Sequence, residues 1–122
     1  MTNPSLILVP LLVNTKKIET LRAHFQAPVE IVLMRAHLDF SDSWVSRVSK
    51  EVDDRLKMIS TVHGKDSGKW ALVVTGPAII DLMIFQRIYD LFGEFPLLLC
   101  FDRTRGAYKI ISFKEGGLDA SS

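Results

Sequence analysis

The sequence holds a single cysteine, Cys100, and this scarcity excludes a disulfide framework. Cys100 lies inside the apolar run PLLLCF and has no partner within the chain, which favours a reducing compartment. A small buried hydrophobic side chain is a commoner role for such a residue than a catalytic thiol. We therefore expect Cys100 to be part of the core.

Apolar runs long enough to cross a membrane are also missing. A spanning helix needs roughly 18 or more apolar residues, and the longest candidate, the stretch after Pro77, is interrupted by Asp81, Gln86, Arg87 and Asp90. The N-terminal MTNPSLILVPLLV lacks the basic segment and the small-residue cleavage site of a signal peptide. We expect a cytoplasmic protein without a membrane partner.

Neither an excess of charge nor a familiar cofactor motif is present. Fifteen Lys and Arg against fourteen Asp and Glu give a net charge of +1, so no general field recruits duplex nucleic acid and any anion site must be local. The sequence has no GxGxxG, GK[ST], HxH, HxxxH, CxxC or GxSxG pattern. Dinucleotide cofactors, ATP hydrolysis, zinc and a serine nucleophile therefore lack specific support, and we expect no cofactor and no metal.

What the chain does contain is an alternation of buried-strand and helix patterns. Hydrophobic residues make up 48% of its 122 residues, which is enough for one globular core. Strands are expected over residues 5–12, 30–40, 70–75, 96–101 and 107–113, and helices over 15–26, 42–60 and the stretch after Pro77. Apolar stripes mark the first two helices: Ile18, Leu21 and Phe25, with Asn14 or Thr15 as the cap, and then Val45, Val48, Val52, Leu56 and Ile59.

This order of elements predicts an α/β fold. Parallel strands need crossover connections, so alternating strands and helices favour a Rossmann-like, mostly parallel sheet with helices on both faces. The last two strands are joined by the short turn DRTRG, which predicts an antiparallel C-terminal edge strand. We expect a single domain over residues 1–115 and a disordered tail over 116–122.

The third helix has almost no polar face. Its apolar side chains encircle it, so it must be buried on every side; they are Ile79, Ile80, Leu82, Met83, Ile84, Phe85, Ile88, Tyr89, Leu91 and Phe92. One hypothesis is that a second subunit covers the side away from the sheet, most simply in a homodimer about a two-fold axis. The alternative is burial within one chain, under the C-terminal hairpin and the neighbouring helices.

Ligands of open parallel sheets bind beyond the carboxyl ends of the strands, a region that we call the crest. It would be built here from residues 10–15, 35–39, 75–78 and 102–105, which bring cations and backbone donors that favour an anion. The candidate ligand-binding residues are Leu12, Val13, Asn14, Thr15, Lys16, Arg35, His37, Thr75, Gly76, Pro77, Ala78 and Arg103.

Two of these groups have a specific physical argument. Gly76 would let a phosphate or ribose approach the backbone, and Pro77 suits a first helical position; an ordinary strand-to-helix turn would look the same. Arg35, His37 and Asp39 alternate, so on a strand they would share one face, with Arg35 for phosphate and His37 for a base or a proton. A solvated edge strand would show the same alternation.

Two segments resemble a known family. APVEIVLMRAHLDFSDSW, and LVVTGPA followed by GEFPLLLCF, resemble parts of small stand-alone CRISPR-associated proteins with a Rossmann-like, CARF-related fold. The resemblance runs from the first strand to Arg103 and rests on the order of elements and on short apolar motifs. It implies a homodimer, or an assembly of dimers, that captures a cyclic oligoadenylate second messenger, with the tetraadenylate ring as the expected form. The family's binding loops would fall on residues 11–15 and 75–78.

Three functions remain as hypotheses. The preferred one is a protein that senses or sequesters the cyclic nucleotide without cutting it, because no acid–base pair stands out by spacing and no catalytic residue is assigned. A metal-independent ring nuclease would position a ribose hydroxyl against the adjacent phosphate, a task for Lys16, Arg35, His37 or Arg103. The third is a non-enzymatic interaction module that recruits a partner through its third helix.

Overall fold

The computed structural model describes residues 3–35, 38–74, 77–114 and 117–121 of the chain. Its helices and strands follow in the order β1 (Leu6–Leu11), α1 (Thr15–Phe25), β2 (Val29–Leu33), α2 (Asp42–His63), a short 3-10 helix η1 (Ser67–Lys69), β3 (Trp70–Val73), α3 (Ala78–Phe92), β4 (Leu97–Asp102), β5 (Ala107–Lys114) and β6 (Gly117–Ser121).

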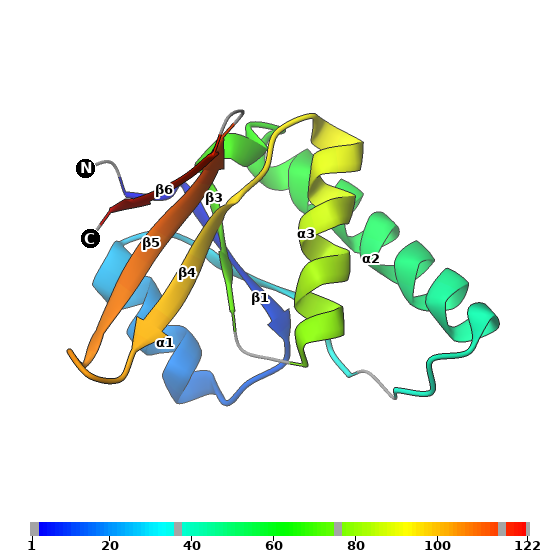
Figure 1. Ribbon diagram of the computed structural model, residues 1–122, viewed down its shortest axis with the longest axis horizontal. Coiled ribbons are helices and arrows are strands. Elements are labelled where there is room, and N and C mark those ends of the chain that lie inside the picture. Colours follow the sequence, from blue (N-terminus) through cyan, green and yellow to red (C-terminus); the bar gives the residue numbers. More distant parts are fainter. Residues whose placement is uncertain (1–2, 36–37, 75–76, 115–116, 122) are drawn as a thin grey trace.

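The strands form one sheet in the order β2-β1-β3-β4-β5-β6 (Figure 1). The ladders between β1 and β2, β1 and β3, and β3 and β4 are parallel, whereas β5 pairs antiparallel with β4 and with β6. The predicted α/β, Rossmann-like fold is confirmed.

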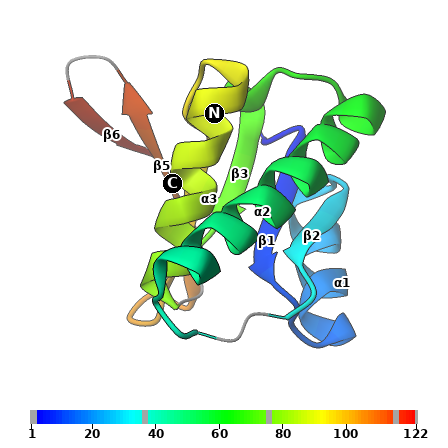
Figure 2. The same cartoon turned by 90° about the vertical axis from the view of Figure 1, so that its right-hand side faces the viewer.

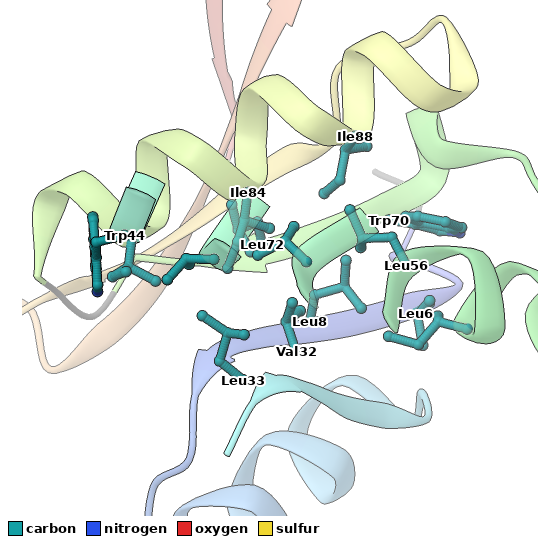
Figure 3. Close-up of a cluster of buried hydrophobic side chains, with 14 residues drawn as sticks. Leu6, Leu8, Val32, Leu33, Trp44, Leu56, Trp70, Leu72, Ile84 and Ile88 are labelled. Carbon is teal, nitrogen blue, oxygen red and sulfur yellow. The ribbon is translucent and has the colours of Figure 1, made fainter. Parts of the chain in front are cut away.

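Helices cover both faces of the sheet: α1 lies on one face, and α2 and α3 lie together on the other (Figures 1 and 2). Strand β1 lies between β2 and β3, and its side chains alternate between two cores. Leu6 and Leu8 pack with α2 and α3 (Figure 3), while Ile7 and Val9 pack with α1. All four are fully buried, which explains why this strand is a continuous apolar run.

The two stripes predicted for the first helices are largely found. Asn14 caps α1 by accepting a hydrogen bond from the backbone N–H of Lys17 at 2.8 Å, and Leu21 and Phe25 are buried. In α2 the buried stripe starts at Trp44, and Val45, which the sequence assigned to it, is 42% exposed. Residues four apart lie on the same face of a helix, so the line through Val48, Val52 and Leu56 continues back to Trp44 and not to Val45.

The second strand is shorter than predicted. The sequence suggested residues 30–40, but β2 ends at Leu33, and Arg35 and Asp39 lie beyond it. Its partner β1 ends at Leu11, paired with Leu33, so a longer β2 would find no backbone groups to pair with. The prediction that Arg35 and Asp39 share one face of a strand is therefore wrong.

The outer side of β2 is held by side chains from α2. The Nε of Arg55 donates to the backbone oxygen of Ile31 at 2.9 Å, and one Nη lies 3.5 Å from a carboxylate oxygen of Glu30. The other oxygen of Glu30 lies 3.0 Å from Nε2 of His63. These contacts fasten the C-terminal half of α2 to the outer strand of the sheet.

The end of the chain adds a strand to the sheet. Gly117–Ser121, within the tail expected over residues 116–122, pair with β5 as strand β6, in a register that sets Phe113 opposite Leu118. The outer edge of β5 offers unpaired backbone groups, and a following segment of any extended sequence can satisfy them.

Helix α3 is covered on three sides by its own chain. Ile80, Ile84 and Ile88 are fully buried against the sheet. Toward the loop before β4, Phe85 stacks on Phe95 with ring centroids 4.8 Å apart, and on the side of α2 Arg87 pairs with Asp53. The chain itself thus covers part of the apolar surface of α3, but Ile79, Leu82 and Tyr89 remain 39%, 64% and 41% exposed.

Candidate functional site: a pocket at the carboxyl ends of the strands

The strand order reverses at β1. From β1 the chain passes through α1 to β2 on one side, whereas β3, and then α3 and β4, follow on the other side. In open α/β sheets such a reversal marks the usual place for a ligand. Pro10 adds a local cause. Successive backbone N–H groups point to opposite sides of a strand, and the N–H of Ile7 donates to the backbone oxygen of Pro28, just before β2. The backbone nitrogen of residue 10 therefore faces β3. Because this residue is proline, it has no N–H to donate. The β1–β3 ladder accordingly stops at Leu8 and Leu72.

A pocket of about 380 Å³ lies beside this point, on the face of the sheet that α1 covers. It is lined by one residue of α1, the end of β3, and residues of β4, β5 and the turn between them, namely Lys17, Val73, Val74, Phe101, Arg103 and Tyr108. The pocket therefore combines cations, aromatic rings and an aliphatic floor.

Local hydrogen bonds order the backbone segments that carry its two cations, Lys17 and Arg103. The cap at Asn14 fixes the backbone of Lys17 in the first turn of α1. Asp102 organises the turn after β4, because its carboxylate accepts from the N–H groups of Thr104 and Arg105 at 3.0 and 3.3 Å. Asp102 also lies 3.7 Å from Nε of Arg105. Within the part of the chain that the structure describes, Lys17 and Arg103 form no ion pair, so both charges are available to an anion.

Two aromatic rings form the other wall. Phe101 and Tyr108 are directly opposite each other in the β4–β5 ladder, with ring centroids 5.2 Å apart and planes inclined by 73°. Phe101 is 52% exposed, whereas Tyr108 is half-buried and packs edge-on against Phe25 at 5.6 Å. Burial raises the pKa of the Tyr108 phenol, so its hydroxyl remains a neutral donor throughout the physiological range.

Of the residues predicted from the sequence, Arg103 lines this pocket. Lys17 lines it in place of the predicted Lys16, because one step along a helix turns the side chain by about 100° and places the two lysines on different sides. Asn14 is at the crest, but its side-chain oxygen is engaged by the helix cap. Three other predicted residues lie in the loop before α1 or at its first position and do not line the pocket: Leu12, Val13 and Thr15.

The other predicted residues lie elsewhere or are not described. Arg35 is exposed after β2, and the strands β1 and β3 separate β2 from β4, so Arg35 and Arg103 are not brought together. Pro77 is the N-cap of α3 rather than its first residue, its carbonyl accepts from the N–H of Ile80 at 3.0 Å, and Ala78 opens the helix. His37, Thr75 and Gly76 fall outside the described residues.

The sequence interpretation missed the aromatic pair and Lys17. A signal for the pair was present: Leu99 and Phe101 alternate along β4, Arg103 follows at the same spacing in the turn, and the short turn sets Tyr108 opposite Phe101. Finding it required the register of the hairpin, which fixes the face that each side chain occupies.

The site offers binding groups for a flat, negatively charged molecule. Over the described ranges, no cluster of three or more His, Cys, Asp or Glu side chains is suited to a metal ion, and no helix there is long and apolar enough to span a membrane. Two unpaired cations and a pair of crossed rings instead match a phosphate next to an aromatic group. Comparison of this chain with protein-family models, with curated proteins and with solved structures finds no match.

Proposed function

We propose that this protein is a cytoplasmic binding protein for a cyclic oligoadenylate, which it senses or sequesters at the crest of a homodimer. The observation that carries the proposal is the pocket at the strand reversal, which Lys17 and Arg103 line together with Phe101 and Tyr108. Phosphates and adenine rings are the groups that such a combination recognises. The ring form follows from the resemblance of the sequence to CARF-related proteins.

A symmetric ligand suits a symmetric pair of chains. Three large apolar residues of α3 are exposed: Ile79 and Leu82 near its start, at 39% and 64%, and Tyr89 near its end, at 41%. Helices α2 and α3 run parallel, because Ser49 contacts Met83 and Asp53 contacts Arg87, so Val45 of α2 lies beside the start of α3. Together Val45, Ile79 and Leu82 form an apolar patch, which we call the outer patch, next to the crest. A second copy of the chain is its proposed partner.

The test is a titration of the purified protein with labelled cyclic tetraadenylate. We expect retention of the intact ring, and a loss of affinity of roughly tenfold or more in Lys17→Ala or Arg103→Ala, because each removes a charge-assisted hydrogen bond. The matched control is Lys57→Ala, which removes the same charge from α2 on the opposite face of the sheet.

The same incubation separates the competing functions. A linear product would favour the metal-independent ring nuclease over the binding protein. Absence of retention in the wild-type protein would contradict the proposal and favour an interaction module. Equal loss of affinity in Lys57→Ala and Lys17→Ala would show that binding depends on general charge and not on the pocket.

A further inference from the structure

The size of the pocket sets a limit on what one chain can hold. Its volume of about 380 Å³ is near the lower end of small-molecule sites, which span roughly 300–1,000 Å³. That volume suits a single nucleotide, and a ring of several would extend beyond the pocket. If the proposed function holds, each chain would therefore bind one nucleotide of the ring. The inference rests on that function only in assuming that nucleotides enter this pocket.

The two rings define a place for a planar group. The planes of Phe101 and Tyr108 are inclined by 73°, so a flat base can lie parallel to only one of the two rings. Phe101 is the more accessible ring, since half of this side chain is exposed, whereas Tyr108 is half-buried and contacts Phe25 and, at 6.0 Å, His24. Phe101 is thus the stacking surface of the site.

The same pocket also supplies two cations for a phosphate. Lys17 comes from α1 and Arg103 from the turn after β4, and both line the pocket that Phe101 and Tyr108 line. We infer that a single chain binds one purine nucleotide in this pocket, with the base stacked on Phe101 and the phosphate between Lys17 and Arg103. A purine is favoured over a pyrimidine because its two fused rings cover more of the exposed Phe101 face.

The inference is tested with mononucleotides, which need neither the ring nor the dimer. Binding of AMP, CMP and ribose 5-phosphate to the wild-type protein and to Phe101→Leu is measured by calorimetry. Stacking on one aromatic side chain is worth roughly 1–3 kcal/mol, or about fivefold to 150-fold in affinity. We expect Phe101→Leu to weaken AMP by at least about fivefold and to leave ribose 5-phosphate unchanged, and we expect the wild type to prefer AMP to CMP.

Phe113→Leu is the matched control, since Phe113 is 40% exposed on β5 and packs on Phe85 of α3, away from the pocket. Equal AMP affinity in the wild type and Phe101→Leu, or failure of the wild type to bind AMP, would overturn the inference. A protein that binds AMP through Phe101 but does not retain the cyclic ring would contradict the proposed function alone. Retention of the ring with full affinity in Phe101→Leu would contradict the inference alone.

Discussion

Arg87 of α3 and Asp53 of α2 form a two-pronged ion pair, with Nε and Nη2 donating to the two carboxylate oxygens at 2.7 and 2.9 Å. Arg87 also reaches Asp90 through Nη1 at 2.9 Å. The hydrogen bond to Asp53 raises the pKa of the guanidinium above its ordinary value, despite the partial burial that opposes it. This contact fixes how the two helices on one face of the sheet lie against each other.

The first prediction concerns the stability that this pair supplies. Both side chains are mostly buried, so Arg87→Ala should lower the free energy of unfolding by about 1–3 kcal/mol. Urea denaturation followed by circular dichroism measures the change. The control is Lys50→Ala, which breaks an exposed pair with Asp54 on the same helix and should cost no more than about 1 kcal/mol. Equal losses of unfolding free energy in the two variants would contradict a special role for the ion pair between Arg87 and Asp53.

The second prediction concerns the outer patch. Leu82→Glu places a charge on a side chain that is 64% exposed, so the monomer should keep its stability while the homodimer dissociates. Light scattering coupled to gel filtration reports the mass of the species. Met58→Glu makes the same kind of change at a 59% exposed residue of α2 and should leave the assembly intact. A monomeric wild-type protein, with and without ligand, would rule out the proposed dimer.

A third prediction uses Cys100 as a probe of the β4 strand. Desolvation raises the pKa of its thiol above 9.0, so less thiolate is present near neutral pH than in an exposed cysteine. Alkylation by iodoacetamide at pH 8 should therefore be slower in the native protein than in urea, and the native rate should still be rising above pH 9. Because the chain has one cysteine, the rate can be assigned without mutagenesis. Cys100 is half-buried and belongs to neither core cluster, unlike the expectation from the sequence, and equal rates in both states would contradict even this partial burial.

The fourth prediction concerns Tyr108. The chain has two tyrosines, so Tyr89→Phe leaves Tyr108 as the only phenol that contributes to the ultraviolet titration. Its absorbance change should be centred above pH 10, because burial raises the pKa of this group. The unfolded phenol ionises first as the pH rises, so the stability that this group contributes is full below pH 10 and declines above it. A midpoint at or below pH 10 would show that the ring wall of the pocket is more open than the structure has it.

The fold could be predicted because strands and helices that are buried show recognisable patterns of apolar residues in the sequence. The run Leu6–Val9 can be so apolar only if both faces of its strand are covered, and that condition implies helices on each side. The boundary of β2 was not accessible in this way. Its length is set by the end of the neighbouring strand at Leu11, which is a property of the pairing and not of residues 34–40.

The site was only partly accessible for a similar reason. The alternation of strands and helices predicted a crest at the carboxyl ends of the strands, and of the residues expected there Arg103 lines the pocket that the structure shows. The distinction between Lys16 and Lys17 depends on how α1 is rotated about its axis, and the Phe101–Tyr108 pair depends on a hairpin register. Both are tertiary facts, so no pattern within one segment contains them.

The hydrogen bond from Arg55 to the backbone oxygen of Ile31 affects how readily the edge of the sheet can aggregate at high protein concentration. Edge-to-edge association pairs the exposed edge strand of one sheet with that of the next, and each such pairing uses backbone oxygens of both strands as acceptors. Here a guanidinium already occupies one such oxygen on the β2 margin, so an incoming chain would first have to displace it. Fibrous polymerisation from this margin is thereby discouraged by a single side chain.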